Sequence, residues 1–408
     1  HVCTMWESVL TAAVVAMAGL AAAGPINTGS VTLFDVFTPA DKVACYRIPV
    51  LTAVRGDGTP EPPGFGVTLY AFAEARLKSC ADGGPKAIVM RTSTDLGKTW
   101  SGEVTVVRDA PEVEDGLNLG AVVQAHTGPP GSLPRLLLFY CECAHACPTA
   151  STMLIESADG GQTWSTPRNL TSTLLGAGIA LFAPGPDHGV AITPKSLVVC
   201  GWYRSTSQKP GEIHSSVCLL SPDGGESWSV GGAVPAVGGI VPNECQPVLL
   251  KNGSVLLNLR DEGRSRARAF AVSDDGGQTF SAPWIRKELP DPTCQGSMVR
   301  LSTTDQLVLS NAHSATARDR MTVTVSRTDG QTWAHDVTVW PGPAAYSSLT
   351  TLFDAPAKGG NPKEPPSVGL LFERGALSPY EKISFGFVRV VPPTTGRDDA
   401  VDGRPEAA

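Results

Sequence analysis

The chain has 408 residues, and its 39 acidic and 32 basic side chains give a formal net charge of −7. This charge argues against a nucleic-acid-binding protein, because such a domain normally carries a basic face that displaces counterions from phosphates. Charged residues make up only 17% of the chain, 43 glycines and 34 prolines are spread along it, and no long run has a helical period. This composition favours an all-β protein of short strands and turns, built as one large repeat domain.

The first notable segment is an apolar run over residues 9–23, which ends in small residues before Gly24 and Pro25. It is too short to span a bilayer comfortably and is typical of the hydrophobic part of a signal peptide. We therefore expect residues 1–24 to be a signal peptide or an N-terminal apolar segment, with a buried helix or a weak membrane anchor as alternatives. Candidate glycosylation triplets at Asn169 and Asn252 agree with a protein of the secretory pathway.

Two series of repeats run along the rest of the chain. Short apolar runs with strand composition lie at 67–76, 135–140, 196–203, 254–260, 306–312 and 367–374. The first five are each followed by a copy of the pattern Ser-x-Asp-x-Gly-x-Thr-Trp, here called an Asp box, which begins at Ser93, Ser157, Ser221, Ser273 and Ser326. The boxes start 64, 64, 52 and 53 residues apart, which suits four-stranded propeller blades. Six runs predict a six-bladed β-propeller over residues 30–394, followed by a disordered tail over 395–408.

Each Asp box is expected to be a structural turn. Its Ser and Asp side chains bond nearby backbone N–H groups, its glycine takes a positive φ, and its aromatic residue packs between strands. The boxes are not expected to bind calcium, since they lack the dense oxygen ligands of an EF-hand. In the fifth box Asp329 lies one residue later than the pattern requires, so that turn is expected to differ.

The ten cysteines are dispersed and do not match a zinc motif. Cys141, Cys143 and Cys147 lie close together, but they lack a second Cys pair or a His pair at metal-ligand spacing. Some disulfides are expected, with a connectivity that the sequence leaves open.

The Asp boxes, together with Tyr46-Arg47-Ile48-Pro49 ahead of the first box, resemble the sialidase superfamily of glycosidases. The resemblance covers nearly the whole chain after residue 40, and its longest matches resemble animal lysosomal sialidases of the neuraminidase 1 type. These matches lie at 71–76, 115–123, 150–157, 163–171, 182–186, 243–247 and 340–349. The resemblance implies a retaining exo-α-sialidase that reaches the lysosome through the secretory pathway and needs no metal or organic cofactor.

Several arginines stand at or near expected strand ends on different blades. Sialic acid carries a carboxylate on its anomeric carbon, and guanidinium groups suit this anion because they stay charged and offer paired donors. The resemblance implies that Arg47, Arg260 and Arg318 form a triad that binds the carboxylate. Arg320 competes with Arg318 for the third place, since residues two apart on a strand face the same side.

The resemblance also supplies candidates for the chemical step. A carboxylate nucleophile would be repelled by the substrate carboxylate, so a phenol is better suited to attack the anomeric carbon, and sialidases are known to use tyrosine. The matching residues are Tyr346 as nucleophile, Glu244 as its base and Asp82 as acid/base. Asp82 is expected in a loop after Arg76, where desolvation would raise its pKa. The alternative interpretations are a packing tyrosine, an exposed loop glutamate and a turn-forming aspartate before Gly83.

Two further residues are expected to support the triad. The resemblance implies that Arg76 adds a contact on the carboxylate side, and that Glu373 pairs with Arg47, because an unpaired buried charge would be costly. Three other arginines are expected to be solvated surface charges, namely Arg264, Arg266 and Arg268.

Two other functions share this type of fold: a non-catalytic propeller that binds glycans or proteins, and a trans-sialidase with the same catalytic residues. The non-catalytic module would not require Tyr346 and Glu244 beside three arginines.

Expected substrates are sialylated glycoproteins, oligosaccharides and gangliosides, and the resemblance implies cathepsin A and β-galactosidase as possible partners. Lysosomal relatives end in a tyrosine-based sorting signal. Here the only late tyrosine motif, Tyr380-Glu-Lys-Ile, is expected to lie in a strand.

Overall fold

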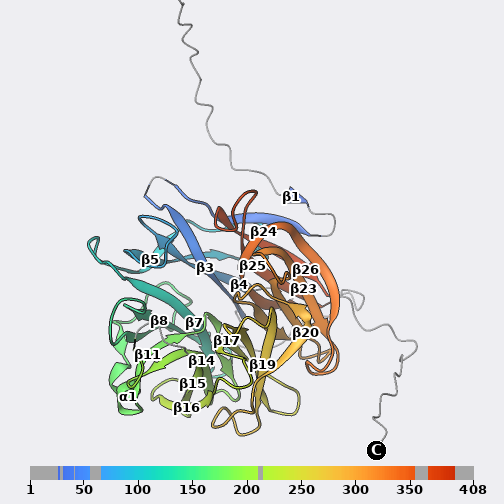
Figure 1. Cartoon of the computed structure of the whole chain (residues 1–408). Helices are drawn as coiled ribbons and strands as arrows, with labels where there is room; N and C mark the ends of the chain where they lie inside the picture. Colours follow the sequence, from blue (N-terminus) through green and yellow to red (C-terminus); the bar gives the residue numbers. More distant parts are fainter. Residues whose placement is uncertain are drawn as a thin grey trace, which may run out of the picture.

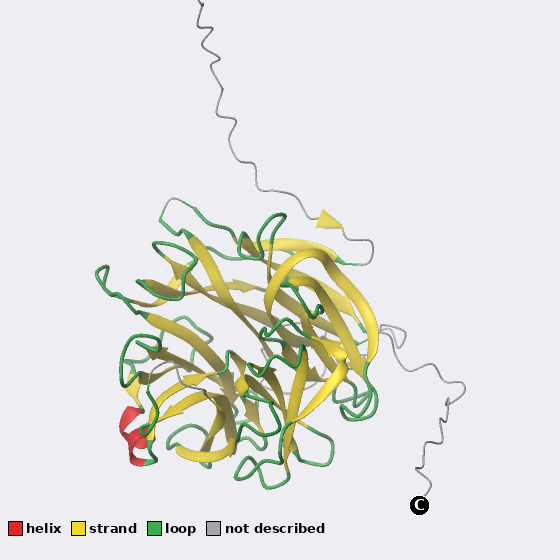
Figure 2. Cartoon of the chain, viewed as in Figure 1, coloured by secondary structure: helices red, strands yellow, loops and turns green. Residues whose placement is uncertain are grey.

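The computed structural model describes residues 26–27, 31–40, 42–55, 66–209, 215–353 and 366–390. The expected signal segment (1–24) and the expected tail (395–408) lie outside the described residues. Within the described ranges the elements are strands apart from one short helix, α1 (Thr171–Gly176), so the all-β prediction is confirmed (Figure 2). None of the helical residues in these ranges forms a segment long and apolar enough to cross a membrane.

The strands form five hydrogen-bonded sheets, which are arranged around a common centre like the blades of a propeller (Figure 1). The first contains β3 (Cys45–Arg55), β4 (Val67–Arg76), β5 (Lys86–Ser93) and β6 (Val104–Arg108). The second contains β7 (Leu117–Ala125), β8 (Arg135–Glu142), β9 (Ser151–Ser157), β10 (Arg168–Asn169) and β12 (Asp187–His188). The third contains β11 (Ile179–Pro184), β13 (Val190–Ala191), β14 (Leu197–Ser205), β15 (Ser215–Ser221) and β16 (Ser229–Val234).

The remaining two sheets complete the ring. The fourth contains β17 (Pro242–Leu249), β18 (Val255–Asp261), β19 (Ala267–Ser273) and β20 (Trp284–Pro290). The fifth has eight strands: β1 (Ile26–Asn27), β2 (Thr32–Phe37), β21 (Ser297–Arg300), β22 (Leu307–Ala312), β23 (Asp319–Ser326), β24 (Ala334–Phe353), β25 (Ser367–Arg374) and β26 (Lys382–Arg389). In this sheet β2 pairs with β26, so a strand from the start of the chain lies beside the last strand.

The number of separate sheets differs from the expected six. The strand β24 has 20 residues, and its first half pairs with β23 while its second half pairs with β25. Its backbone therefore continues from one four-stranded unit into the next, and hydrogen bonding joins both units into a single sheet. A sequence pattern that marks one apolar run per unit does not reveal such continuity.

All six expected apolar runs are strands, namely β4, β8, β14, β18, β22 and β25. Each is hydrogen-bonded to a strand on either side, which explains why its side chains are largely buried on both faces. Hydrophobic clusters fill the space between neighbouring sheets. In one of them Leu137 and Phe139 of β8 pack with Leu197 and Val199 of β14. These clusters give the strand ends at the centre a rigid support.

The Asp-box segments form turns with a shared hydrogen-bond pattern. In the second box Ser157 Oγ accepts the Gly161 N–H at 2.8 Å, and the Asp159 carboxylate accepts the Thr163 N–H at 3.0 Å. In the fifth box the Thr328 hydroxyl takes the place of that carboxylate and accepts the Thr332 N–H at 2.8 Å. This turn therefore differs from the others, as expected, but it keeps the same backbone contact.

We predict that Ser157→Ala destabilises the protein. Ser157 is 1% exposed, and its removal leaves the Gly161 N–H without its acceptor, which costs about 1–3 kcal/mol for a buried donor. Urea unfolding followed by tryptophan fluorescence measures the change in the free energy of unfolding. Ser229→Ala, at an exposed strand position, is the control. An unchanged free energy for Ser157→Ala would show that this hydrogen bond does not hold the turn.

Candidate active site

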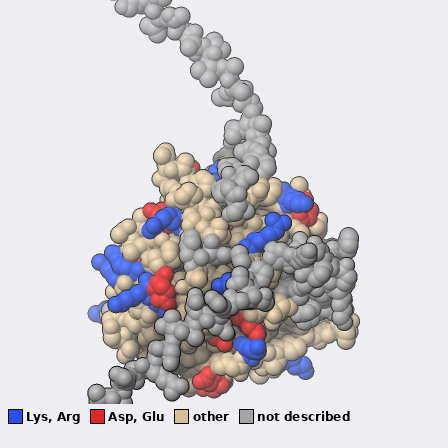
Figure 3. Space-filling view, turned by 90° about the vertical axis from the view of Figure 1, so that its right-hand side faces the viewer, with Lys and Arg blue, Asp and Glu red and all other residues tan. Residues whose placement is uncertain are grey.

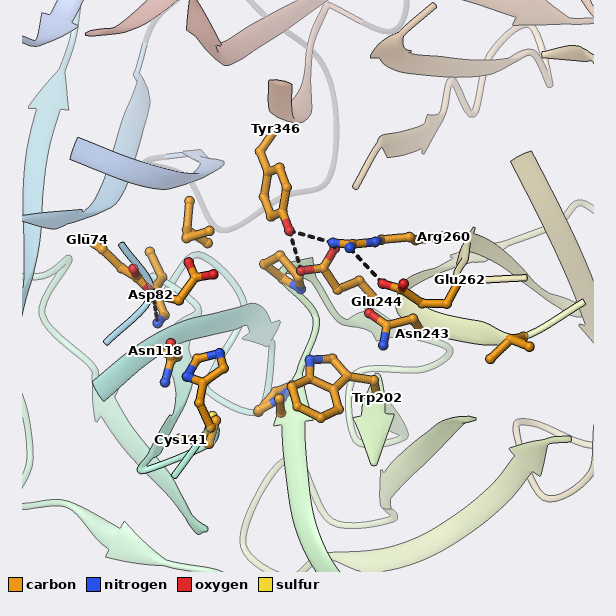
Figure 4. A pocket seen from close by; sticks show the side chains of 18 of the residues that line it. Glu74, Asp82, Asn118, Cys141, Trp202, Asn243, Glu244, Arg260, Glu262 and Tyr346 are labelled. Carbon is orange, nitrogen blue, oxygen red and sulfur yellow. Dashed lines mark hydrogen bonds and ion pairs between the residues drawn. The ribbon is translucent and has the colours of Figure 1, made fainter. Parts of the chain in front are cut away.

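A cavity of about 640 Å³ lies where strands from different sheets end near the centre of the molecule. Its wall includes ten residues that Figure 4 labels: Glu74, Asp82, Asn118, Cys141, Trp202, Asn243, Glu244, Arg260, Glu262 and Tyr346. They come from β4, β7, β8, β14, β17, β18 and β24 and from two loops. The cavity is therefore a joint product of the sheets and cannot form from any single one.

A phenol, a carboxylate and a guanidinium meet on one side of the cavity (Figure 4). The Tyr346 hydroxyl donates a hydrogen bond to Glu244 Oε1 at 2.6 Å. Nη1 of Arg260 donates to the Tyr346 oxygen at 2.9 Å and to Glu244 Oε2 at 2.8 Å. The Tyr346 proton thus points at a carboxylate that could accept it, while Arg260 faces the oxygen that would become negative.

The surroundings of Tyr346 control its ionisation. Burial raises the pKa of Tyr346 well above its ordinary value, and the nearby Glu244 carboxylate raises that pKa further. The positive charges of Arg260 and Arg318 lower the same pKa, but their effect is smaller. The phenol is therefore protonated in the free site, and a reaction at its oxygen requires transfer of the proton at the same time.

Arg47, in β3, is held by a buried carboxylate from β25. Its Nε lies 2.6 Å from Glu373 Oε1, and Glu373 is fully buried. The same carboxylate accepts the backbone N–H groups of Ile48 at 2.9 Å and Tyr346 at 3.1 Å. The structure thus brings Glu373 to Arg47, where it was expected, and shows that it also fixes the backbone under Tyr346.

Arg318 lies directly before β23 and reaches the cluster, whereas Arg320 does not. The Arg318 guanidinium carbon is 5.5 Å from the centre of the Tyr346 ring. Arg320 is exposed and pairs with Asp319 at 3.4 Å. The expectation that both face the same side is wrong, because Arg320 has a φ of 56° and the pairing register shifts beside it.

One of the three arginines expected on the surface is buried. Arg264 and Arg266 are exposed, as expected, but Arg268 is 1% exposed. Arg268 lies in β19, donates to Asn258 Oδ1 and pairs with Asp291 at 3.3 Å. The Arg268 charge is therefore balanced inside the protein by Asp291, a residue 23 positions later, which the local sequence around Arg268 could not show.

The loop that carries Asp82 is tied to the sheet beside Arg47. A disulfide joins Cys80 of this loop to Cys45 at the start of β3. Arg76 Nη1 donates to the Cys80 carbonyl at 2.6 Å and lies 2.8 Å from Asp82 Oδ1. Asp82 itself is in the loop between β4 and β5, as expected, and its side chain is 62% exposed.

The expected rise in the Asp82 pKa is not found. Partial burial acts to raise the pKa of Asp82. The positive charges of Arg76 and Arg47 and the hydrogen bond from Arg76 together outweigh this effect, so the pKa lies below its ordinary value. The prediction considered desolvation alone and missed the two guanidinium groups. Asp82 is therefore ionised in the free site at neutral pH.

Several cavity residues were not predicted from the sequence. Glu74 pairs with Arg76 at 2.8 Å, and its other oxygen accepts the Leu119 N–H. Glu262 lies 2.6 Å from Nη2 of Arg260. The signal for Glu74 was present, since residues two apart on a strand face the same side. Glu262 lies after the end of β18, where periodicity gives no such signal.

His145 also lines the cavity and was not predicted from the sequence to do so. It belongs to a short loop closed by the Cys143–Cys147 disulfide. Asp115 accepts the N–H groups of His145 and Ala146, each at 2.7 Å, and lies 3.0 Å from His145 Nδ1. Because an ionised carboxylate can only accept hydrogen bonds, the hydrogen bond between the two side chains requires a proton on His145 Nδ1.

Cysteines and other metal-ligating groups are accounted for within the described part of the chain. A third disulfide joins Cys200 to Cys218, while Cys141, Cys245 and Cys294 are free and buried. No group of three or more His, Cys, Asp or Glu side chains in these ranges is placed to hold a metal ion.

Basic and acidic side chains are mixed in the cavity wall and on the face that Figure 3 shows. On the part of the face that Figure 3 shows in colour, small groups of Lys and Arg and of Asp and Glu are scattered among other residues. Arg76 and Arg260 line the cavity, and Arg47 and Arg318 lie beside one of its wall residues, with guanidinium carbons 5.2 and 5.5 Å from the centre of the Tyr346 ring. These guanidinium groups could donate paired hydrogen bonds to an anionic ligand in the cavity.

Comparison with known proteins gives matches over most of the chain. A model of the BNR repeat-like domain matches residues 67–357. The chain is 31% identical to a sialidase of Micromonospora viridifaciens over 84% of its own length and 52% of the relative. It is 30% identical to Sialidase-2 of Cricetulus griseus over 83% of its own length and 91% of the relative. It also matches Sialidase-4 of Mus musculus, at 28% identity over 62% of this chain and 54% of the relative.

The relatives differ in length from this chain, and solved structures show that the fold is also similar. The chain spans about half the length of the Micromonospora viridifaciens and Mus musculus relatives. The structure named Hadza microbial sialidase Hz136 has a TM-score of 0.72 at 22% identity, over 88% of this chain and 68% of that one. A Trypanosoma rangeli sialidase in complex with 2,3-difluorosialic acid, described as a covalent intermediate, has a TM-score of 0.65 at 15% identity, over 87% and 58%.

We predict that the two arginines beside Asp82 set its ionisation. Replacing both members of the buried pair, Glu74→Gln with Arg76→Gln, removes the nearest positive charge without leaving a buried carboxylate unpaired, so the pKa of Asp82 rises. Carboxyl ¹³C shifts of labelled aspartate, assigned with Asp82→Asn, report this pKa. Arg91→Gln is the control, because Arg91 lies five residues along β5 from Lys86, the residue that pairs with Arg76. An unchanged or lower pKa in the double variant contradicts the electrostatic account.

Proposed function

The chain belongs to the sialidase superfamily, and from this premise we propose that it is a retaining exo-α-sialidase that removes terminal sialic acid from glycoconjugates. The observation that carries the proposal is the hydrogen-bonded group of Tyr346, Glu244 and Arg260, with Asp82 on the other side of the same cavity (Figure 4). A phenol paired with a carboxylate base is the arrangement that attack on an anionic sugar needs.

In the first proposed step the substrate carboxylate lies against Arg47, Arg260 and Arg318. The Tyr346 oxygen attacks the anomeric carbon while its proton passes to Glu244, over the 2.6 Å hydrogen bond that is already present. The bond from the anomeric carbon to the glycosidic oxygen breaks, and Asp82 donates a proton to that oxygen. The product of this step is a sialyl-tyrosine.

In the second proposed step water replaces the tyrosine. Asp82, now a carboxylate, takes a proton from the water as it attacks the anomeric carbon. The bond to Tyr346 breaks, and Glu244 returns its proton to the phenol oxygen. Two inversions give sialic acid with net retention, and the enzyme regains its starting protonation.

Substrate binding favours the uptake from solvent of the proton that Asp82 lacks in the free site. The substrate carboxylate offsets the charges of Arg47 and Arg76, and the sugar shields the exposed Asp82 side chain from water, so both effects raise the pKa of Asp82. This makes protonated Asp82 the scarce form at neutral pH. The reaction is therefore expected to favour acidic conditions.

The finer assignments are also proposals. The eight-stranded sheet is best interpreted as two blades joined by β24, which gives a six-bladed propeller. Support comes from the six buried apolar strands and from the separate pairing of the two halves of β24. The preference for gangliosides or glycoproteins, the lysosomal location and a complex with cathepsin A and β-galactosidase stay predictions that rest on the sequence resemblance.

We predict that Tyr346→Phe loses at least about 10²-fold in kcat on a fluorogenic aryl sialoside, because the nucleophilic oxygen is absent. Tyr70→Phe, a buried tyrosine away from the cavity, is the control. Release of the aryl group is followed by fluorescence, and ¹H NMR identifies the first anomer formed. The α anomer is expected. Formation of the β anomer first, or full activity in Tyr346→Phe, contradicts the mechanism.

A folded wild-type protein that binds sialosides without cleaving them would point instead to a non-catalytic binding propeller. Sialyl transfer to added lactose in place of release into water would point to a trans-sialidase. Both outcomes would reject the proposed hydrolase.

We predict that Asp82→Asn affects substrates according to their leaving group. An aryl leaving group departs with little protonation, whereas a sugar hydroxyl requires an acid, so the variant loses far more activity on sialyllactose than on the aryl sialoside. In the wild type, kcat/KM for sialyllactose falls as the pH rises from about 5 to 8, since protonated Asp82 becomes scarcer. Equal losses on the two substrates, or a rate that rises over this pH range, exclude Asp82 as the acid.

A further inference from the structure

Tyr380 contacts two of the arginines that are proposed to bind the substrate carboxylate. It lies in the turn between β25 and β26, not in a strand as expected from the sequence. Its hydroxyl accepts a hydrogen bond from Arg318 Nη1 at 2.8 Å. The centre of its ring lies 4.1 Å from the Arg47 guanidinium carbon, and the Tyr346 ring lies 5.2 Å from the same carbon. Arg47 therefore contacts two aromatic rings.

The turn that carries Tyr380 is fixed by its own hydrogen bonds. The Glu381 carboxylate accepts the N–H groups of Ala376, Leu377 and Ser378 at 3.0, 2.7 and 2.9 Å. Gly375 N–H donates to the carbonyl of Pro343, three residues before Tyr346 in β24. Tyr380 is therefore presented from a rigid turn that rests on the strand carrying the proposed nucleophile.

The partner of Arg318 differs in charge from the partners of the other cavity arginines. Those arginines pair with carboxylates, namely Arg47 with Glu373, Arg76 with Glu74 and Arg260 with Glu244. Within the described residues, no carboxylate lies within 4.0 Å of Arg318. A phenol can hold a guanidinium in place through its oxygen without cancelling its charge, because the phenol is neutral. Arg318 thus keeps its full charge for an incoming anion.

We propose that Tyr380 is a positioning residue, which holds Arg318 by a hydrogen bond and Arg47 by ring contact so that both face the substrate carboxylate. This inference rests on the proposed function. It assigns a role to the tyrosine of the Tyr380-Glu-Lys-Ile motif, which was expected from the sequence to lie in a strand. Tyr380 acts through the arginines and takes no part in bond making.

Two substitutions separate the contacts. Tyr380→Phe keeps the ring over Arg47 and removes the acceptor for Arg318, whereas Tyr380→Leu removes both. Loss of a hydrogen bond to a charged group corresponds to about a 10- to 100-fold weaker interaction. We expect KM for the aryl sialoside to rise by about that factor in Tyr380→Phe and more in Tyr380→Leu, with kcat changed by less than about threefold, since the carboxylate is held equally in ground and transition states.

Calorimetry with 2,3-dehydrosialic acid and with its methyl ester tests whether the effect acts on the carboxylate. The acid should bind Tyr380→Phe about 10-fold or more weaker than wild type, while the uncharged ester should bind both equally. Tyr70→Phe is the matched control, and thermal unfolding monitors the fold of every variant.

Three results would overturn the proposal: unchanged binding of the acid in Tyr380→Phe, equal loss for acid and ester, or a fall in kcat with KM unchanged. The calorimetric arm does not need turnover. If the wild type binds the dehydrosialic acid but cleaves no sialoside, the proposed function fails while the role of Tyr380 is still decided.

Discussion

Four guanidinium groups converge on one cavity, and their mutual repulsion is the constraint that the rest of the site must satisfy. Like charges a few ångströms apart repel in a partly buried site, and nearby carboxylates offset this repulsion for three of the four arginines, whereas Arg318 is held by the Tyr380 hydroxyl. The structure supplies these groups from different sheets. Glu373 contributes most, because one buried carboxylate holds Arg47 at 2.6 Å and two backbone N–H groups, including that of Tyr346. Loss of that carboxylate would disturb both Arg47 and the backbone of Tyr346, the proposed nucleophile.

The same constraint explains why a ring of sheets carries this chemistry. Arg47, Arg260 and Tyr346 come from β3, β18 and β24, which are far apart in sequence and meet only at the centre. The packed clusters between the sheets hold these strands against the repulsion, and they also hold a strained backbone. Ile48 has a φ of 56°, which costs a β-branched residue of order 1–3 kcal/mol. Its N–H donates to Glu373, so the strain is linked to the arrangement of the site.

Local patterns in the sequence predicted the strands and turns well, because burial and turn chemistry depend on residues close in sequence. They did not reveal that β24 continues through two units, since backbone continuity leaves no mark in side-chain composition. Motifs located Arg47, Glu244 and Tyr346, which the structure brings to one cavity. The low pKa of Asp82 and the buried state of Arg268 depend on charges brought together by the fold, so neither could be predicted from nearby sequence. Tyr380 was expected in a strand, but it lies in a turn that Glu381 holds by accepting three backbone N–H groups.

The central claim is that Tyr346 forms a covalent bond to the substrate, and trapping that bond tests it most directly. A 2,3-difluorinated sialic acid carries a good leaving group at the anomeric carbon, and its second fluorine slows hydrolysis because it disfavours the oxocarbenium-like transition state. After incubation, proteolysis and mass spectrometry should find a fluorosialyl group on the peptide that contains Tyr346. Attachment to a different residue, or no attachment in a protein that still hydrolyses sialosides, would contradict the account.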